Sequence, residues 1–277
     1  MKLVSLLLSL FLMLGNASAA DGQFDVKTVV YKNLVAKLYL PRSAVKVPVV
    51  IAFGGSDGGL AGGDGNAELL APHGIAVLSL AFFKGEGIPP TLDQIPLEYF
   101  VSAVDYLATV PAVDAGKIGV VSGSRGSEAA LLLASIDPRI TSVVVTTPSN
   151  VAWQGMTREK SAWTYKGQDI PALAMALGAS APKVSRFEAA LANKDNMRRA
   201  QFAIENINGP ILMVSATKDQ IWPSFQMATE MTLYLKERGF AHGVTHSTYP
   251  TGHGFSKETA PAIKRQIVAH FLELLQK

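Results

Sequence analysis

Continuous apolar runs of strand length recur along this chain, and segments of helical pattern separate them. The runs are VPVVIAF (47–53), IAVLSLAFF (75–83), KIGVVS (117–122), ITSVVVTT (140–147) and PILMVSA (210–216). A strand that is apolar at every position is typical of a parallel sheet covered on both faces. Between two of the runs, helical spacing relates Leu97, Val101, Val104 and Ala108, and Pro111 follows as a stop. We therefore expect an α/β fold with a mostly parallel, doubly wound sheet.

The two ends and the middle of the chain complete the expected architecture. Residues 25–40 alternate weakly, which predicts two antiparallel strands with a turn at Lys32-Asn33. Further helices are expected at 67–71, 127–135, 225–238 and 257–275, and a last strand at 244–250. The alternation stops between residues 148 and 208, where only a helical patch at 187–192 stands out. We expect this segment to be a cap inserted over one edge of a single domain that spans residues 21–277.

The first 20 residues have the pattern of an export signal. Lys2 precedes an apolar run from Leu3 to Leu14, and small residues follow, with cleavage sites at Ala17-Ser18-Ala19 or at Ser18-Ala19-Ala20. The run is shorter than the roughly 20 residues that span a bilayer. We expect residues 1–20 to be a cleaved signal peptide and the mature protein to be periplasmic, without membrane insertion. An uncleaved N-terminal anchor helix is the alternative.

Composition excludes several kinds of chemistry. The chain has no cysteine, so disulfides, cysteine nucleophiles and thiolate metal sites are excluded. The formal net charge is only +3, and no run of Lys and Arg is present. We therefore expect no nucleic-acid partner, and we expect neither a metal site nor a cofactor.

The segment SGSRG (122–126) follows a predicted strand and opens a predicted helix. This is the place of a nucleophile elbow, a sharp turn that lifts a serine off the sheet and needs small residues two positions before and after it. Ser122 stands where glycine is commoner, and Gly126 fills the other position. Ser124 is therefore the candidate nucleophile. The alternative is a helix N-cap formed by Ser124 or Ser127, with Glu128 near the position of a capping box.

A serine nucleophile needs a base and a carboxylate that orients the base, and in this kind of fold the chain order is serine, acid, histidine. Asp219 and His253 each lie just past a late predicted strand. They are the candidate acid and base, although Asp219 is also suited to capping a turn. Asp57 and Asp64 are weaker candidates for the acid. His246, within a strand, and His270, on the last helix, are expected to be structural or solvated. His73 is suited to the C-terminal end of a helix, and His242 lies in the turn after Gly239.

Acyl transfer also needs hydrogen-bond donors aimed at the developing oxyanion. The backbone N–H of Arg125, directly after Ser124, is one candidate, and the glycine-rich loop 54–59 offers a second through Gly55 or Ser56. Glycine-rich loops after strands also bind nucleotide phosphates. This loop, however, has neither a G-x-G-x-x-G register nor a G-K-[ST] ending.

Five segments, in order, resemble the C-terminal catalytic domain shared by acyl-CoA thioesterases and bile acid-CoA:amino acid N-acyltransferase, a relative of the dienelactone hydrolases. They are IPLEYFVSAVDYL, VSGSRGSEAALLLAS, SAWTYKG, NGPILMVSATKDQIWPS and YPTGHGF, and the likeness runs from about Val47 to the C-terminus. The resemblance implies an α/β-hydrolase fold with Ser124, Asp219 and His253 as a catalytic triad. This agrees with the assignment made from the residues.

The chain departs from that family in ways that bear on its substrate. Amino-acid transfer in the family is associated with a cysteine nucleophile, so the absence of cysteine favours hydrolysis. We expect no counterpart of the N-terminal sandwich domain of the animal enzymes, because few residues precede the catalytic core in this sequence. An exported protein would also meet little acyl-CoA. The expected function is that of an exported serine hydrolase acting on acyl thioesters, with oxygen esters as the alternative and a non-catalytic acyl-binding protein as a third possibility.

Four aromatic residues are candidates for the wall of an acyl pocket. Trp153, Trp163 and Tyr165 belong to the expected cap, and Trp222 lies beside the candidate acid. For each of them, ordinary packing of the cap against the core is an equally good interpretation.

Overall fold

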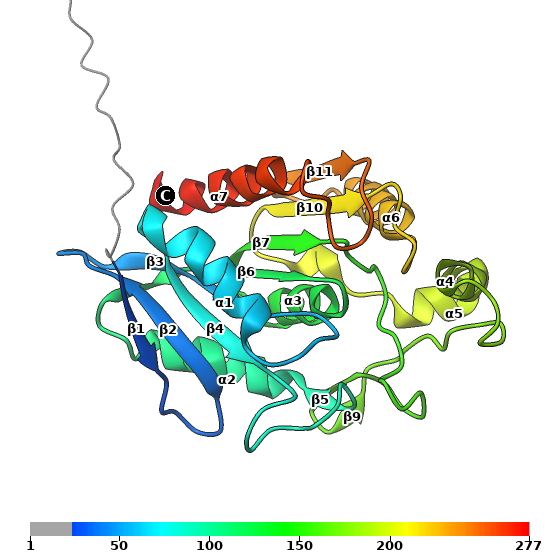
Figure 1. Cartoon of the computed structure of the whole chain (residues 1–277), viewed down its shortest axis with the longest axis horizontal. Helices are drawn as coiled ribbons and strands as arrows, with labels where there is room; N and C mark the ends of the chain where they lie inside the picture. Colours follow the sequence, from blue (N-terminus) through cyan, green and yellow to red (C-terminus); the bar gives the residue numbers. More distant parts are fainter. Residues whose placement is uncertain (1–23, 277) are drawn as a thin grey trace, which may run out of the picture.

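The apolar runs form the centre of an eight-stranded sheet in the computed structural model, which describes residues 24–276 (Figure 1). The strands are β1 (Phe24–Thr28), β2 (Val35–Pro41), β3 (Val47–Ala52), β4 (Ala76–Ala81), β6 (Val113–Gly123), β7 (Ile140–Thr146), β10 (Ile211–Ala216) and β11 (Val244–Tyr249). Their order in the sheet is β1-β2-β4-β3-β6-β7-β10-β11. Only the β1–β2 and β2–β4 pairs are antiparallel. The predicted signal peptide at 1–20 lies outside the described residues.

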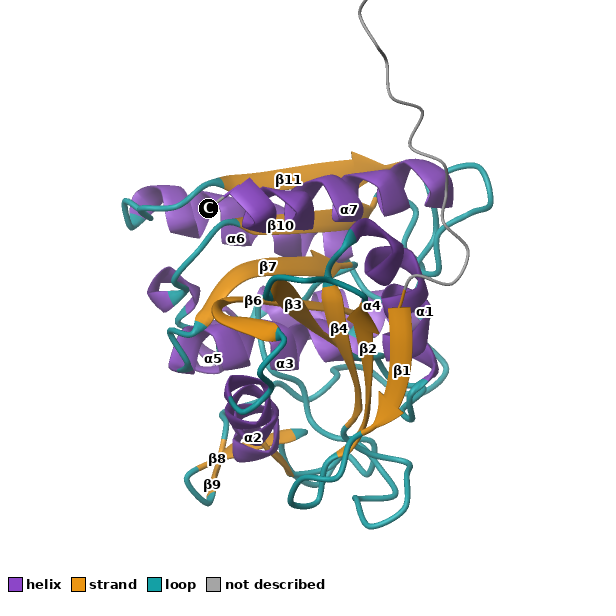
Figure 2. Ribbon diagram, turned by 90° about the vertical axis from the view of Figure 1, so that its left-hand side faces the viewer, coloured by secondary structure: helices purple, strands orange, loops and turns teal. Residues whose placement is uncertain are grey.

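Both faces of the sheet are covered, which explains why β3, β4 and β10 are buried at every position. The helices are α1 (Ala61–Leu70), α2 (Leu97–Ala108), α3 (Arg125–Ile136), α6 (Ser224–Glu237) and α7 (Ala260–Gln276). Alternate residues of one strand enter opposite layers: Ile51 packs with α2 and α3, whereas Val50 packs with α1 and α7 (Figure 2). A sheet between two helical layers confirms the predicted doubly wound architecture.

Helix α1 begins earlier than the sequence pattern predicts. We expect a short helix at residues 67–71, but the helix starts at Ala61 and contains three glycines in its first half. A Cβ at Gly62 would lie 2.5 Å from the Cα of Gly54, and one at Gly63 would lie 2.6 Å from the carbonyl oxygen of Ala52. Close approach of the helix to the end of β3 therefore requires these glycines, although glycine usually disfavours a helix.

Residues 148–208 form a segment of short elements beside the carboxyl ends of the strands. They include β8 (Trp163–Tyr165), β9 (Gln168–Asp169), α4 (Lys183–Ala192) and α5 (Lys194–Ala200). Strands β8 and β9 form a second small sheet with β5 (Ile95–Pro96), which precedes α2 in the chain. Helix α4 contains the predicted helical patch, whereas α5 and the small sheet carry no periodic signal in the sequence.

No helix between residues 24 and 276 is both long enough and apolar enough to cross a membrane.

Candidate active site

Ser124 lies at the sharp turn between β6 and α3, in a backbone conformation that is unusual for serine. Its φ is 52° and its ψ is −130°, in a region that favours glycine. The backbone N–H of Ser124 donates to the carbonyl of Thr146 on β7 (3.0 Å), and its own carbonyl accepts from the N–H of Ser127 (2.9 Å). The neighbouring strand and the first turn of α3 thus hold the strained residue in place.

The small residues around Ser124 are required by close backbone contacts. A Cβ at Gly126 would lie 2.0 Å from the hydroxyl oxygen of Ser122 and 2.2 Å from the carbonyl oxygen of Gly54. The Ser122 hydroxyl donates to the carbonyl of Phe53 (2.8 Å), at the end of β3. Serine is therefore tolerated where glycine is commoner because its hydroxyl has a backbone partner there.

The structure brings the three candidate residues together, although 129 positions separate the first from the last. The Nε2 of His253 lies 2.8 Å from the Oγ of Ser124, and the Nδ1 of His253 lies 2.8 Å from the Oδ2 of Asp219. Asp219 follows β10 and His253 follows β11, so both stand at the same edge of the sheet as the turn after β6. With Nδ1–H facing the carboxylate, the ring can accept the serine proton on Nε2.

Asp219 is held as an ionised acceptor. Its side chain is only 2% exposed, and burial by itself would raise its pKa. Hydrogen bonds from His253 and from the hydroxyl of Ser224 (2.7 Å) outweigh burial and lower the pKa below its usual range. The backbone N–H of Ile221 donates to the same carboxylate (2.9 Å). These contacts fix the direction in which the carboxylate faces the imidazole.

The structure does not match the alternative in which Ser124 or Ser127 caps helix α3 and Glu128 completes a capping box. The Ser124 side chain makes no capping hydrogen bond to α3, and the Glu128 side chain faces the cap. The Ser127 hydroxyl donates to the carbonyl of Ser124 (2.6 Å). Of the weaker acid candidates, Asp64 pairs with Lys37 (2.8 Å) and Asp57 lies exposed in the loop after β3.

The other histidines lie away from Ser124 and contact different groups. His246 on β11 contacts the hydroxyl of Ser215 (2.7 Å), and His270 on α7 contacts the hydroxyl of Ser142 (2.9 Å). His73 and His242 are exposed. The positions of His246 and His270 agree with the structural or solvated roles expected for them. His73 is the last residue of a short 3₁₀ helix, Ala71–His73, as expected.

The loop after β3 packs directly against the turn that holds Ser124. A Cβ at Gly55 would lie 3.0 Å from the Cβ of Ser124 and 3.5 Å from the backbone nitrogen of Arg125. Within residues 24–276, the backbone N–H of Ser56 donates no hydrogen bond, and that of Arg125, at the first position of α3, has no intrahelical acceptor. Backbone N–H groups without a partner among residues 24–276 thus occur close to Ser124, both in the loop after β3 and at the start of α3.

A cavity of about 250 Å³ opens beside Ser124, between the cap and the sheet. Trp153 and Trp222 line it, together with Phe187 from α4. The three rings meet edge to face, with centroids 4.6 Å apart for Trp153–Phe187 and 5.7 Å apart for Phe187–Trp222. The Trp222 ring in turn contacts the ring of His253 (5.8 Å). Two of the four predicted aromatic residues thus form a wall next to the candidate nucleophile.

The other two aromatic candidates lie elsewhere. Trp163 is fully buried and packs against Phe82 and Phe100 in the main core, and Tyr165 also packs against that core. Neither lines the cavity beside Ser124. For these two residues, packing of the cap on the core is the interpretation that fits the structure. The reason is β8, which turns residues 163–165 toward α2.

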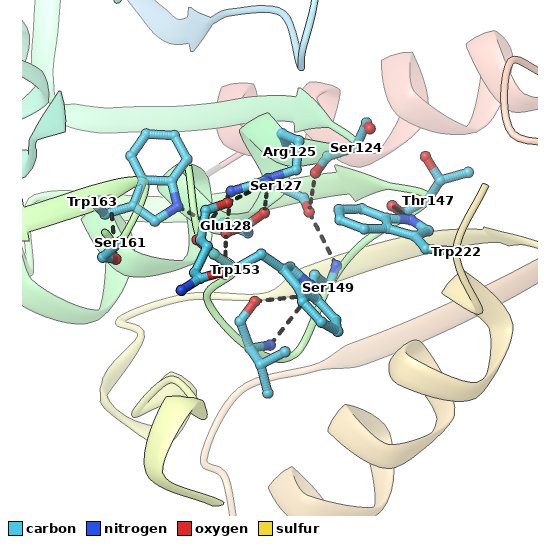
Figure 3. A network of polar contacts seen from close by, with 12 residues as sticks. Ser124, Arg125, Ser127, Glu128, Thr147, Ser149, Trp153, Ser161, Trp163 and Trp222 are labelled. Carbon is cyan, nitrogen blue, oxygen red and sulfur yellow. Dashed lines mark hydrogen bonds and ion pairs between the residues drawn. The ribbon is translucent and has the colours of Figure 1, made fainter. Parts of the chain in front are cut away.

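Sequence reasoning missed the role of Glu128. This residue is fully buried, and its carboxylate contacts Arg125, Trp153 and Trp163 (Figure 3). One signal was available in the sequence: Glu128 is the only charged residue in the apolar stretch from 127 to 135, and it lies one helical turn from Arg125.

Among residues 24–276 no group of acids and histidines is arranged to hold a metal ion.

Solved structures with the same architecture are α/β hydrolases. An esterase from Pyrobaculum calidifontis superposes with a TM-score of 0.63 at 18% identity, covering 93% of this chain and 87% of that one. Dienelactone hydrolase from Anabaena variabilis superposes with a TM-score of 0.58 at 17% identity, covering 91% and 98%. The strand order and these likenesses define the class: the fold is that of an α/β hydrolase, as the sequence predicts.

The family is narrower than the fold. A family model described as BAAT / Acyl-CoA thioester hydrolase C terminal matches residues 95–273, well over half of the chain. The chain belongs to this family, as its motifs indicate. Curated relatives include human acyl-coenzyme A thioesterase 6, 31% identical over 73% of this chain and 48% of that protein. Mouse peroxisomal succinyl-coenzyme A thioesterase is 31% identical over 79% of this chain and 51% of that protein. The chain thus spans about half the length of these relatives.

Proposed function

We propose that this protein is a serine hydrolase that cleaves acyl thioesters, with Ser124 as nucleophile, His253 as general base and Asp219 as the residue that orients the base. The observation that carries the proposal is the 2.8 Å contact between the Ser124 hydroxyl and Nε2 of His253, made from a strained turn. Membership of the acyl-CoA thioester hydrolase family supports the thioester as the substrate class.

The proposed reaction has two steps that use the same residues. His253 takes the proton of Ser124 as its Oγ attacks the thioester carbonyl, and Asp219 stabilises the resulting imidazolium. The backbone N–H groups of Arg125 and of Gly55 or Ser56 donate to the oxyanion of the tetrahedral intermediate. The C–S bond then breaks and His253 returns the proton to the departing thiolate. In the second step His253 activates a water molecule, which releases the acid and restores Ser124.

The acyl group would occupy the cavity beside Ser124. Its aromatic wall of Trp153, Phe187 and Trp222 suits an apolar chain. At a liquid-water volume of roughly 30 Å³ per molecule, the cavity equals about eight water molecules, which is room for a short or medium acyl chain.

Hydrolysis assays test this proposal. A hexanoyl thioester and the matching p-nitrophenyl ester should both be cleaved, with the higher kcat/KM for the thioester, and Ser124→Ala should lower both rates by at least about 10³-fold. A higher kcat/KM for the oxygen ester would favour the carboxylesterase alternative. If the wild type cleaves neither substrate but binds the acyl chain, the protein is a binding protein on a hydrolase scaffold.

We further propose that the protein is exported to the periplasm after removal of residues 1–20. Support comes from Lys2, the apolar run and the small residues at 17–19. N-terminal sequencing of the protein from a periplasmic fraction should give Ala20 or Asp21 as the first residue. Recovery of the protein with Met1 intact in the membrane fraction would instead indicate an uncleaved anchor.

A further inference from the structure

The first turn of α3 carries a carboxylate that the proposed chemistry does not use. Glu128 is fully buried, and its Oε2 accepts hydrogen bonds from the backbone N–H of Trp153 (3.0 Å) and the indole N–H of Trp163 (2.8 Å). Burial raises the pKa of Glu128, and attraction to Arg125 opposes the rise. A carboxylate at such a place is costly unless hydrogen bonds and a cation compensate for its lost hydration.

Arg125 supplies that cation and connects it to the cap (Figure 3). Its Nε lies 2.5 Å from Oε1 of Glu128, and its Nη2 donates to Oε2 of the same carboxylate (3.5 Å). At the other end of the guanidinium, Nη1 donates to the carbonyl of Gln154 (3.0 Å) and Nη2 to that of Trp153 (3.2 Å). One side chain, on the residue after Ser124, thus joins the helix to the backbone of the cap.

A third connection between the first turn of α3 and the cap runs through Ser127 and Ser149. The Ser127 hydroxyl accepts from the backbone N–H of Ser149 (3.1 Å) while it donates to the carbonyl of Ser124. The Ser149 hydroxyl in turn accepts from the indole N–H of Trp153 (2.9 Å). The backbone of Trp153 is therefore held by Arg125 and Glu128 on the first turn of α3. Its ring is held by Ser149, whose backbone N–H is in turn bound by Ser127 of the same turn.

We propose that Arg125 and Glu128 are a positioning pair that sets the Trp153 wall of the acyl cavity relative to Ser124, and that this pair determines which acyl groups are cleaved fast. This inference rests on the proposed hydrolase function. Neither side chain touches the reacting atoms in the proposed mechanism. The pair acts on acyl groups long enough to reach Trp153, whereas an acetyl group ends near Ser124 and gains little from the wall.

A neutral double variant separates positioning from folding. Arg125→Met alone leaves a buried carboxylate without its cation, and such single removals are strongly destabilising. Arg125→Met combined with Glu128→Gln removes both charges, and the amide oxygen of the new side chain can still accept from Trp163. The matched control is Arg198→Met, which breaks the exposed ion pair of Arg198 with Asp195 at the same i,i+3 spacing in the cap.

The experiment measures kcat and KM of these proteins with acetyl and hexanoyl thioesters of one thiol. In the double variant we expect kcat/KM for the hexanoyl thioester to fall by about tenfold or more, because a small displacement of a substrate-contacting wall has effects of this size. For the acetyl thioester we expect a fall at least about threefold smaller than the fall for the hexanoyl thioester, because the wall contacts only the longer chain. For Arg198→Met we expect no change in the ratio of the two kcat/KM values. A merely structural role lowers the amount of active enzyme and scales both substrates equally. Equal falls, or an unchanged ratio, would overturn the inference.

A spectroscopic readout makes the test independent of activity. The chain has three tryptophans, so a proton–nitrogen correlation spectrum contains three indole N–H signals. Trp163 donates to Glu128, whereas Trp222 donates to the carbonyl of Thr147 (3.1 Å). Glu128→Gln should shift the Trp163 signal and leave that of Trp222 in place. An unchanged Trp163 signal would contradict the network. A wild type that cleaves neither thioester would refute the proposed function and the inference with it, whereas an active wild type with unaltered variants refutes the inference alone.

Discussion

The strained turn at Ser124 predicts an unusual order of stability among substitutions at this position. Ser124→Gly and Ser124→Ala both remove the hydroxyl and its contact with His253. They differ in how they accommodate a φ of 52° and a ψ of −130°. Alanine must keep the strain that serine has, whereas glycine adopts this conformation without a clash of its Cβ. We expect Ser124→Gly to be the more stable of the two.

The expected difference is the relief of strain minus the greater flexibility of glycine in the unfolded chain. A residue held in a sparsely populated backbone region costs of order 1–3 kcal/mol. The extra freedom of glycine in the unfolded state costs about 0.4–1 kcal/mol relative to alanine. The balance is about 1 kcal/mol in favour of glycine, equivalent to roughly 2 °C in the melting temperature of a protein of this size.

Urea unfolding at pH 7, with circular dichroism as the signal, measures this difference. Ser102 in the middle of α2 is the matched control, because its helical backbone gives glycine no such advantage. There the order should reverse, with Ser102→Gly less stable than Ser102→Ala by up to about 1 kcal/mol. If Ser124→Ala proves as stable as Ser124→Gly or more stable, the turn is not strained and the reasoning fails.

Three further predictions concern the surroundings of the site. Gly126→Ala should lower the free energy of unfolding by about 3 kcal/mol or more, because its Cβ would lie 2.0 Å from the Ser122 hydroxyl; a urea midpoint equal to that of the wild type would refute this close contact. Asp219→Asn should lower kcat by roughly 10⁴-fold. Since the pKa of Asp219 is lowered in the folded state, its stabilising contribution is present at neutral pH and lost as the pH falls through that pKa. Urea unfolding should therefore show the variant to be less stable at pH 7, with a deficit that shrinks as the pH falls below the usual range of an aspartate carboxyl. Equal stabilities at pH 7 would contradict the role of these hydrogen bonds. Burial lowers the pKa of His246, so the unfolded chain takes up its proton first and stability falls as the pH drops below about 6.5. Unfolding at pH 7 and pH 5 should show a smaller loss in His246→Gln, and a loss as large as that of the wild type would assign the pH dependence to other groups.

The sheet and the three candidate site residues could be predicted because short, local sequence patterns indicate each of them. Each central strand is an apolar run, and Ser124, Asp219 and His253 each follow such a run. In parallel strands the carboxyl ends share one edge of the sheet, so residues far apart in the chain meet there. Gly62 and Gly63 obscured the start of α1, because a close approach to the end of β3, and not helix propensity, requires glycine at these two positions.

The cap was less predictable because tertiary contacts determine it. Strands β8 and β9 have three and two residues, too few for an alternating pattern, and β8 pairs with β5 from a distant part of the chain. Composition alone placed Trp153 and Trp163 together as candidates for the acyl wall. Their roles differ because the Trp163 ring packs in the core and donates to Glu128, while Trp153 lines the cavity beside Ser124.

Identification of the residue that a fluorophosphonate modifies tests the central claim most directly. The probe reacts with a serine only where a base has activated it, and peptide mass spectrometry locates the adduct. We predict one adduct, on Ser124, that disappears in Ser124→Ala and persists in Ser122→Ala. An unlabelled wild type, or an adduct on Ser122 or Ser127, would contradict the assignment of Ser124 as the nucleophile.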